Sequence, residues 1–183
     1  MSLQWQRLRQ RLDALVLPDR LSPDPERPIL HVDIDQQLLG LLRPDDPVVR
    51  YYPVSTSARG RGQREGSFCT PTGWHRIAEC IGAGEPVGRV FRGRRATDEI
   101  LLPEDYQGDE DVITTRILRL EGLEPGHNRG GDCDSRERYI YLHGTADEER
   151  IGQPVSKGCI RLRNSDILDL FERVRSGDLL LIE

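Results

Sequence analysis

One histidine and one cysteine in the last third of the chain are the residues best suited to nucleophilic chemistry. His143 ends an apolar run, and Cys159 follows sixteen residues later on a turn rich in small and polar residues. A free thiol has a pKa near ~8.5, so at neutral pH it is a weak nucleophile unless a base or a positive charge assists it. His143 is a suitable base, and Lys157 and Arg161 add positive charge beside the thiol. The pair predicts a cysteine nucleophile assisted by a histidine.

The turn before the cysteine is suited to a site where an oxyanion develops. Gly158 has no Cβ, so its backbone can approach a substrate carbonyl, and the successive N–H groups of Gly158 and Cys159 can face the oxyanion. Ser156 is expected either to donate a hydrogen bond within the loop or simply to form its turn. Arg161 is expected either to support the loop through an ion pair or to hold a substrate carboxylate.

A longer pattern around these residues resembles the signature of a known family. The segments His143-Gly144-Thr145 and Ser156-Lys157-Gly158-Cys159-Ile160-Arg161-Leu162 are similar to the signature of the YkuD-type L,D-transpeptidases. Upstream, residues 54–57 and 70–77 resemble a strand, a turn and the next strand of the same domain. The resemblance covers residues 29–183, which we expect to form the catalytic domain.

The resemblance implies a cysteine acyltransferase of peptidoglycan. In that family the cysteine attacks the carbonyl that joins the third residue of a stem peptide to D-alanine, releases D-alanine and forms a thioester. Carried over to this chain, Cys159 is the nucleophile, His143 is the base, and the carbonyl of Gly144 orients the imidazole. Lys157 stands where many relatives have histidine. The implied substrate is a stem tetrapeptide or muropeptide, and carbapenem-type inhibitors are expected to acylate the thiol.

Three further residues are candidates for the wall of the substrate site. Tyr141 is expected to face the core or the cleft wall. Glu124 and Asn128 lie in the glycine-dense segment 122–131 and are candidate polar contacts, although a plain turn accounts for this segment equally well. No cofactor is expected. No metal is expected either, because the histidines and cysteines lack the paired spacing that nucleates a zinc site.

The composition is that of a single soluble domain. Among 183 residues, 26 are basic and 31 acidic, and the net charge of −5 argues against nucleic acid or an anionic membrane as the main partner. No apolar run reaches the ~18 residues that a membrane span requires. Cys69, Cys80 and Cys133 are too scattered for a disulfide framework and are expected to be free thiols.

Residues 1–28 are expected to form an amphipathic helix and a proline-rich connector. Trp5, Leu8, Leu12 and Leu15 recur at helical spacing, which favours a helix packed on the domain. The segment lacks the long apolar stretch and cleavage site of a secretory signal. We therefore expect a cytoplasmic protein, with a periplasmic one as the alternative if a leader is missing from the sequence.

A cytoplasmic location bears on the acceptor that resolves the thioester. No second peptidoglycan strand is present in the cytoplasm, so water is the expected acceptor. The chain is then predicted to be an L,D-carboxypeptidase that trims D-alanine during cell-wall recycling. The alternatives are a transpeptidase that makes 3→3 cross-links or anchors proteins, and a catalytically silent domain that binds stem peptides.

The remaining pattern predicts a β-rich α+β fold, which the resemblance specifies as a β-sandwich-like catalytic domain with a few short helices. Leu30, Val32 and Ile34 alternate with polar residues, as in a half-buried strand. A helix is expected over residues 165–175, with Asn164 as its N-cap. Residues 57–67 are expected to be a flexible loop. Further strands are expected at residues 48–55, 73–78, 87–92, 113–120, 139–142 and 178–182.

Overall fold

The described part of the chain is built almost entirely of strands. The computed structural model describes residues 10, 26–43, 49–108 and 110–183, so the predicted N-terminal helix lies, apart from residue 10, outside the described residues. The strands are β1 (Ile29–Asp33), β2 (Leu38–Leu42), β3 (Arg50–Pro53), β4 (Gly73–Ile81), β5 (Arg89–Arg92), β6 (Arg95–Ile100), β7 (Ile113–Gly122), β8 (Tyr141–Thr145), β9 (Ile160–Leu162) and β10 (Leu179–Ile182). The helices are α2 (Asn164–Phe171) and three short 3-10 helices, η1 (Pro103–Asp105), η2 (Gly131–Cys133) and η3 (Glu148–Arg150).

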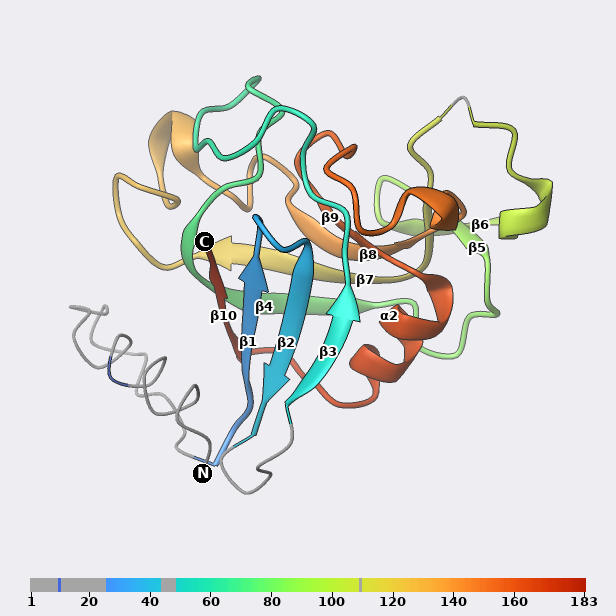
Figure 1. The fold of residues 1–183 in the computed structure, drawn as a ribbon, viewed down its shortest axis with the longest axis horizontal. Coiled ribbons are helices and arrows are strands. Elements are labelled where there is room, and N and C mark those ends of the chain that lie inside the picture. Colours follow the sequence, from blue (N-terminus) through green and yellow to red (C-terminus); the bar gives the residue numbers. More distant parts are fainter. Residues whose placement is uncertain (1–9, 11–25, 44–48, 109) are drawn as a thin grey trace.

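These strands form one curled sheet. Its order is β3-β2-β1-β10-β4-β7-β5-β6, with β8 paired to β7 and β9 paired to β8. Ser55, just beyond β3, bridges Arg161 of β9, and both of their backbone N–H···O distances are 2.9 Å. The sheet therefore curls back on itself, and in Figure 1 strands β1 and β2 cross in front of β4 and β7 at a steep angle. The predicted β-rich, sandwich-like fold is confirmed.

The main core fills the inside of this curl. It contains fully buried side chains from both halves of the sheet, such as Leu30, Leu120 and Leu180. Helix α2 adds Ile167 and Leu170, which are fully buried as well. Burial of each such side chain stabilises the fold by ~1.5–3 kcal/mol. This core fixes strands β7, β8 and β9, which carry the candidate site.

A smaller apolar cluster lies on the opposite face of the same strands. Phe91, Ile117 and Tyr141 are buried there, and Cys159 packs against them. Successive residues of a strand point to opposite faces, so Leu142 enters the main core while Tyr141 and His143 point outward. The candidate nucleophile is thus part of the outward cluster.

Several predicted boundaries differ from the structure. Strands β2, β6 and β9 were not predicted, because β2 contains Gly40, β6 is largely exposed and polar, and β9 has only three residues. Strand β8 begins at Tyr141, since Tyr139 has a left-handed backbone with φ 58° that interrupts a regular strand.

The predicted N-cap is wrong. Asn164 is the first residue of α2, and its own N–H donates to the carboxylate of Glu148 at 2.7 Å. The Asn164 side chain points into the protein, where Oδ1 accepts hydrogen bonds from the hydroxyls of Thr114 and Thr115. The helix also ends at Phe171, four residues earlier than predicted.

The segment 57–67, predicted to be a flexible loop, is anchored to the rest of the structure by Arg138. Its guanidinium donates to the carbonyl oxygens of Gly62 and Gln63 in the segment and of Cys69 just beyond it, with distances of 2.7–3.1 Å.

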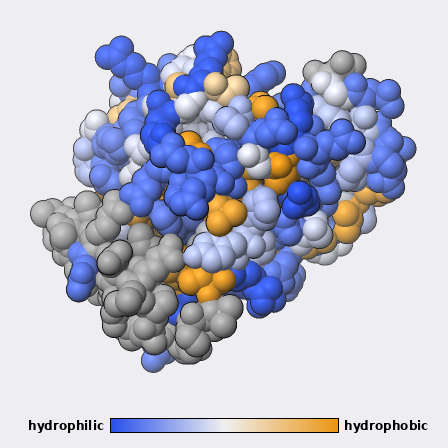
Figure 2. Space-filling model, viewed as in Figure 1, coloured by the Kyte–Doolittle hydropathy of each residue, from blue (hydrophilic) through white to orange (hydrophobic). Residues whose placement is uncertain are grey.

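The surface of the molecule is mainly hydrophilic on the face visible in Figure 2, with small apolar patches between charged residues. Within the described ranges no helix is long and apolar enough to cross a membrane.

Candidate active site

Strands β8 and β9 place the histidine and the cysteine on one face of the sheet. The two strands are parallel, with Leu142 opposite Ile160 and His143 opposite Arg161. Leu142 and Ile160 point into the main core, so His143 and Arg161 point to the other face. Cys159 immediately precedes β9 and packs on that outward face beside Tyr141. The two residues predicted to work together therefore share a face, with His143 on β8 and Cys159 just before the adjacent strand β9.

The imidazole of His143 is buried and held in one tautomer. Its Nδ1 lies 2.9 Å from the carbonyl oxygen of Gly144, and only 1% of the residue is exposed. A carbonyl oxygen only accepts hydrogen bonds, so Nδ1 carries the proton and Nε2 is left with a free lone pair. Burial lowers the pKa of His143, while the negative charge of Asp111 opposes the shift. At neutral pH the ring is uncharged and Nε2 can accept a proton.

The thiol of Cys159 is also uncharged at rest. Its Sγ lies 3.3 Å from the carbonyl oxygen of Tyr139, to which it donates. Burial raises the pKa of the Cys159 thiol to about 12, although the backbone N–H of Tyr141 and the charges of Arg138 and Arg161 act to lower it. Positive charge beside the thiol therefore acts in the predicted direction but does not outweigh burial.

The loop before the candidate nucleophile is held by two hydrogen bonds within the loop and by one from Thr70. Ser156 Oγ donates to the carbonyl oxygen of Cys159 at 2.6 Å and accepts from the N–H of Gly158 at 3.2 Å. Thr70 Oγ1 donates to the carbonyl oxygen of Gly158 at 3.0 Å. Of the two roles considered for Ser156, the structure contains the hydrogen bond within the loop. Lys157 in the same loop is exposed to solvent.

Arg161 forms a buried ion pair instead of facing a substrate. Its guanidinium lies 3.1 Å from Asp147 and 3.3 Å from Asp111, and it also donates to Ser55 Oγ. Only 2% of the Arg161 side chain is exposed. Of the two roles considered for this arginine, the structure contains the ion pair. A cavity of about 630 Å³ between η1 and η3 borders Asp147 and does not reach the thiol.

The glycine-dense segment 122–131 is tied to the start of β4. Asn128 is fully buried, and its amide donates to the carbonyl oxygens of Thr72 and Trp74 at 3.0 Å. The carboxylate of Glu124 accepts the backbone N–H of Trp74. The side chain of Asn128 is therefore unavailable to a substrate, and that of Glu124 is occupied by the backbone. This outcome favours the plain-turn alternative for the segment.

Three residues near the thiol were not singled out from the sequence. Asp111 and Arg138 act on the pKa of Cys159, and Arg94 donates from Nη1 to the hydroxyl of Tyr141 at 3.1 Å. Tyr141 itself is buried, and this burial raises the pKa of its hydroxyl. None of the three belongs to a recognisable local motif, since each reaches the site through tertiary contacts.

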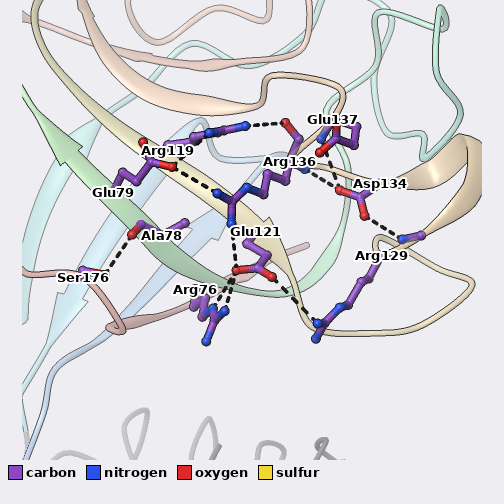
Figure 3. Close-up of polar contacts among 11 residues, drawn as sticks. Arg76, Ala78, Glu79, Arg119, Glu121, Arg129, Asp134, Arg136, Glu137 and Ser176 are labelled. Carbon is purple, nitrogen blue, oxygen red and sulfur yellow. Dashed lines mark hydrogen bonds and ion pairs between the residues drawn. The ribbon is translucent and has the colours of Figure 1, made fainter.

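A network of ion pairs between arginines and glutamates involves residues of β4 and β7 (Figure 3). Tyr141 lies opposite Arg119 in the pairing of β8 with β7, and Arg119 pairs with Glu79 at 2.9 Å. Glu79 and Glu121 together bind the four arginines Arg76, Arg119, Arg129 and Arg136. Within the described residues no group of three or more histidine, cysteine, aspartate or glutamate side chains is arranged to hold a metal.

Comparison with known proteins agrees with this geometry. The family model for the YkuD L,D-transpeptidase catalytic domain matches residues 27–182. The chain belongs to this family. The predicted family resemblance is thereby confirmed, and the residues His143, Gly144 and Cys159 lie inside the matched region.

Two relatives from Escherichia coli match most of this YkuD-family chain. The probable L,D-transpeptidase YcfS is 30% identical over 168 residues, covering 90% of this chain and 47% of the relative. The probable L,D-transpeptidase ErfK/SrfK is 29% identical over 170 residues, covering 89% and 46%. The chain thus spans about half the length of these curated relatives.

Solved structures of L,D-transpeptidases share the fold. The enzyme from Xylanimonas cellulosilytica (residues 123–326) superposes with a TM-score of 0.54 and 17% identity, covering 97% of this chain and 69% of the other. An L,D-transpeptidase from Mycobacterium smegmatis gives a TM-score of 0.51 and 19% identity, covering 86% and 58%. At these identities the likeness concerns the fold.

Proposed function

We propose that this chain is a cysteine acyltransferase that acts on stem tetrapeptides of peptidoglycan. The observation that carries the proposal is the hydrogen bond from His143 Nδ1 to the Gly144 carbonyl, which leaves Nε2 unprotonated on the face that holds Cys159. Membership of the YkuD family supplies the substrate class. An L,D-transpeptidase family enzyme with this pair has the groups that acyl transfer through a thioester requires.

In the proposed first half-reaction, Sγ of Cys159 attacks the carbonyl carbon of stem-peptide residue 3. The thiol proton passes to Nε2 of His143 as the carbon–sulfur bond forms. The imidazolium then gives this proton to the nitrogen of D-alanine as the carbon–nitrogen bond breaks. Because both groups are neutral at rest, the proton transfer accompanies the attack rather than preceding it.

The developing oxyanion needs a hydrogen-bond donor close to the sulfur. The N–H of Gly158 is directed at Ser156 Oγ at 3.2 Å, so the backbone N–H of Cys159 is the donor that we propose for the oxyanion. The bond from Ser156 Oγ to the Cys159 carbonyl fixes the peptide planes on which this donor depends. Ser156 and Gly158 are therefore proposed to act by shaping the loop.

The acceptor of the second half-reaction is an amine or water. The descriptions of the E. coli relatives as probable L,D-transpeptidases favour an amine, which would give a 3→3 cross-link or an anchored protein. Hydrolysis to a tripeptide, as predicted from the sequence, is the alternative and goes with the predicted cytoplasmic location. Cell fractionation tests that location directly.

The test uses a purified disaccharide-tetrapeptide and mass spectrometry of its products. Release of D-alanine by the wild type and its loss in Cys159→Ala supports the proposal, with Cys80→Ala as a matched control because Cys80 is an exposed free thiol. A 3→3 dimer identifies an amine acceptor, whereas tripeptide alone identifies water. A wild-type protein that binds the tetrapeptide without releasing D-alanine would instead be the silent binding domain.

A β-lactam adduct offers a second test of an acylatable thiol. A structure of L,D-transpeptidase 3 from Mycobacterium tuberculosis, which shares the fold with a TM-score of 0.50 and 16% identity, contains a faropenem-derived adduct. We propose that Cys159 is acylated by carbapenem-type compounds as well. Intact mass after incubation with a carbapenem should show one adduct on the wild type and none on Cys159→Ala.

A further inference from the structure

Arg94 is a cation at the mouth of the site for which the reaction described above has no use. Its guanidinium carbon lies 5.4 Å from the centroid of the Tyr139 ring, and Nη1 donates to the hydroxyl of Tyr141 at 3.1 Å. The carbonyl oxygen of Tyr139 in turn accepts the thiol of Cys159 at 3.3 Å. Tyr139 is 55% exposed, so the stacked pair borders solvent next to the nucleophile.

The backbone under this pair is held in an uncommon conformation. Gly93 and Arg94 form the two-residue turn between β5 and β6, with φ values of 56° and 67°. Positive φ at both central residues defines a type I′ turn, which prefers glycine at the second position. Tyr139 has φ 58° as well. Non-glycine residues in this region cost free energy and cluster at functional sites, which points to a role for these two side chains.

Arg94 forms no ion pair in the described part of the structure, and Glu79 acts on it only through its more distant charge. The neighbouring arginines Arg119 and Arg136 are paired with Glu79 (Figure 3), and Arg161 is paired with Asp147 and Asp111. Arg94 has no carboxylate within ion-pair distance among residues 26–43, 49–108 and 110–183. Of its five N–H donors, one is used by Tyr141. The others remain for a ligand.

A substrate carboxylate suits this position. Arg161, once a candidate for holding such a carboxylate, is buried in ion pairs and cannot do so. In the proposed reaction the leaving D-alanine bears a free carboxylate three bonds from the carbonyl carbon that Sγ attacks, so it must lie within a few ångström of the sulfur. A guanidinium matches a carboxylate with two parallel hydrogen bonds, which fixes orientation as well as charge.

We propose that Arg94, supported by Tyr139, binds the free carboxylate of the D-amino acid that leaves when Cys159 is acylated. This inference rests on the proposed function. It makes Arg94 the residue that distinguishes a stem peptide ending in a free acid from one whose terminal carboxylate is blocked.

The test compares a tetrapeptide that ends in D-alanine with the same peptide ending in D-alanine amide. Arg94→Gly removes the guanidinium and places glycine where the turn prefers it, so the variant keeps its fold. We expect its KM for the acid to rise about tenfold, with little change for the amide. Arg94→Lys should restore part of the loss. Arg92→Ala, on the same hairpin and paired only at the surface with Glu99, is the matched control and should behave as the wild type.

An equal loss on acid and amide would overturn the proposal, because Arg94 would then act only by supporting Tyr139 and Tyr141. The proposal would also be overturned if Lys157→Ala, and not Arg94→Gly, removed the preference for the acid over the amide. A third arm uses peptides whose residue 3 carries or lacks a side-chain carboxylate. If the effect of Arg94→Gly follows that carboxylate instead of the terminal one, the assignment to the leaving group is wrong.

Two measurements distinguish a failure of this inference from a failure of the proposed function on which it rests. If the wild type releases neither D-alanine nor its amide, the proposed function fails. Calorimetric binding of the acid and amide to Cys159→Ala, with and without Arg94→Gly, reads the subsite without turnover. The acid should bind more tightly than the amide only while Arg94 is present, and equal affinities in the presence of Arg94 would contradict the subsite.

Discussion

The Nδ1 atom of His143 lies 2.9 Å from the carbonyl oxygen of Gly144, the next residue in the chain. This contact assigns the proton to Nδ1 and makes Nε2 the basic atom, as a carboxylate does in other triads. Because the backbone supplies the acceptor, no third side chain is needed to orient the ring. The orientation of the proposed base is thus set by the local geometry of β8.

The pH dependence of activity should show a base that stays neutral below the ordinary range of histidine. Burial lowers the pKa of His143 from 6.5, so kcat/KM should fall only as the pH drops below 6.5. The pKa of about 12 for Cys159 predicts slow alkylation by iodoacetamide at pH 7 that accelerates toward alkaline pH. Rates on a tetrapeptide and peptide mapping of the alkylated thiol measure both. A kcat/KM that already falls above pH 6.5 as the pH is lowered, together with rapid alkylation of Cys159 at pH 7, would indicate a preformed thiolate–imidazolium pair instead.

Arg161→Met should lower the free energy of unfolding and should not act by weakening substrate binding. The change leaves the carboxylates of Asp147 and Asp111 without their buried partner, which costs about 3–5 kcal/mol when one member of a buried pair is removed. Urea denaturation measures the loss. Arg163→Ala, at a side chain that is 42% exposed and 4.0 Å from Asp166, is the control and should change stability by less than about 1 kcal/mol. A raised KM with unchanged stability would return Arg161 to the substrate site.

Asn164→Ala and Asn164→Asp separate an interior role from a capping role. Alanine removes the acceptor of the buried Thr114 and Thr115 hydroxyls, at a cost of about 2–3 kcal/mol. Aspartate is a good N-cap but puts a second carboxylate beside Glu148, which now receives the Asn164 amide at 3.0 Å, so it should destabilise as well. Exposed Ser165→Ala is the control. An Asn164→Asp protein as stable as the wild type would indicate a cap.

His75 should make the fold sensitive to acid. It is fully buried between the Gly73 carbonyl and the Ser135 hydroxyl, and burial lowers its pKa from 6.5 to about 4. Between these pH values the unfolded chain binds a proton that the folded chain does not, so the free energy of unfolding falls as the pH is lowered. The loss by pH 4 is on the order of 3 kcal/mol.

Urea midpoints between pH 7 and pH 4 test this for the wild type and His75→Gln. The variant is expected to start less stable at pH 7 but to lose less stability over the interval. His143, whose pKa is also lowered, contributes the same slope to both proteins. Identical slopes for the two proteins would show that His75 is not held neutral by the fold.

The sequence predicted the parts of the site that are contiguous in the chain. His143, Gly144 and the loop 156–161 belong to one local signature, and the alternation of Leu30, Val32 and Ile34 with polar residues identifies β1. Arg94, Asp111 and Arg138 were not predicted, because each reaches the surroundings of the thiol through tertiary contacts from another loop or hairpin. Arg161 and Asn128 were each left with two possible roles, because the sequence does not show whether a polar side chain contacts a substrate or buried groups of the protein. Asn164 shows the limit of capping rules when a side chain finds better partners in the interior.

The most direct test of the account is the mass of the protein during turnover of a stem tetrapeptide. We predict a transient adduct equal to the substrate less D-alanine, mapped by digestion to the peptide that contains Cys159. It should be absent in Cys159→Ala and strongly reduced in His143→Gln, with Cys80→Ala unchanged. D-Alanine release at the wild-type rate by Cys159→Ala, with no adduct on any protein, would contradict the thioester mechanism.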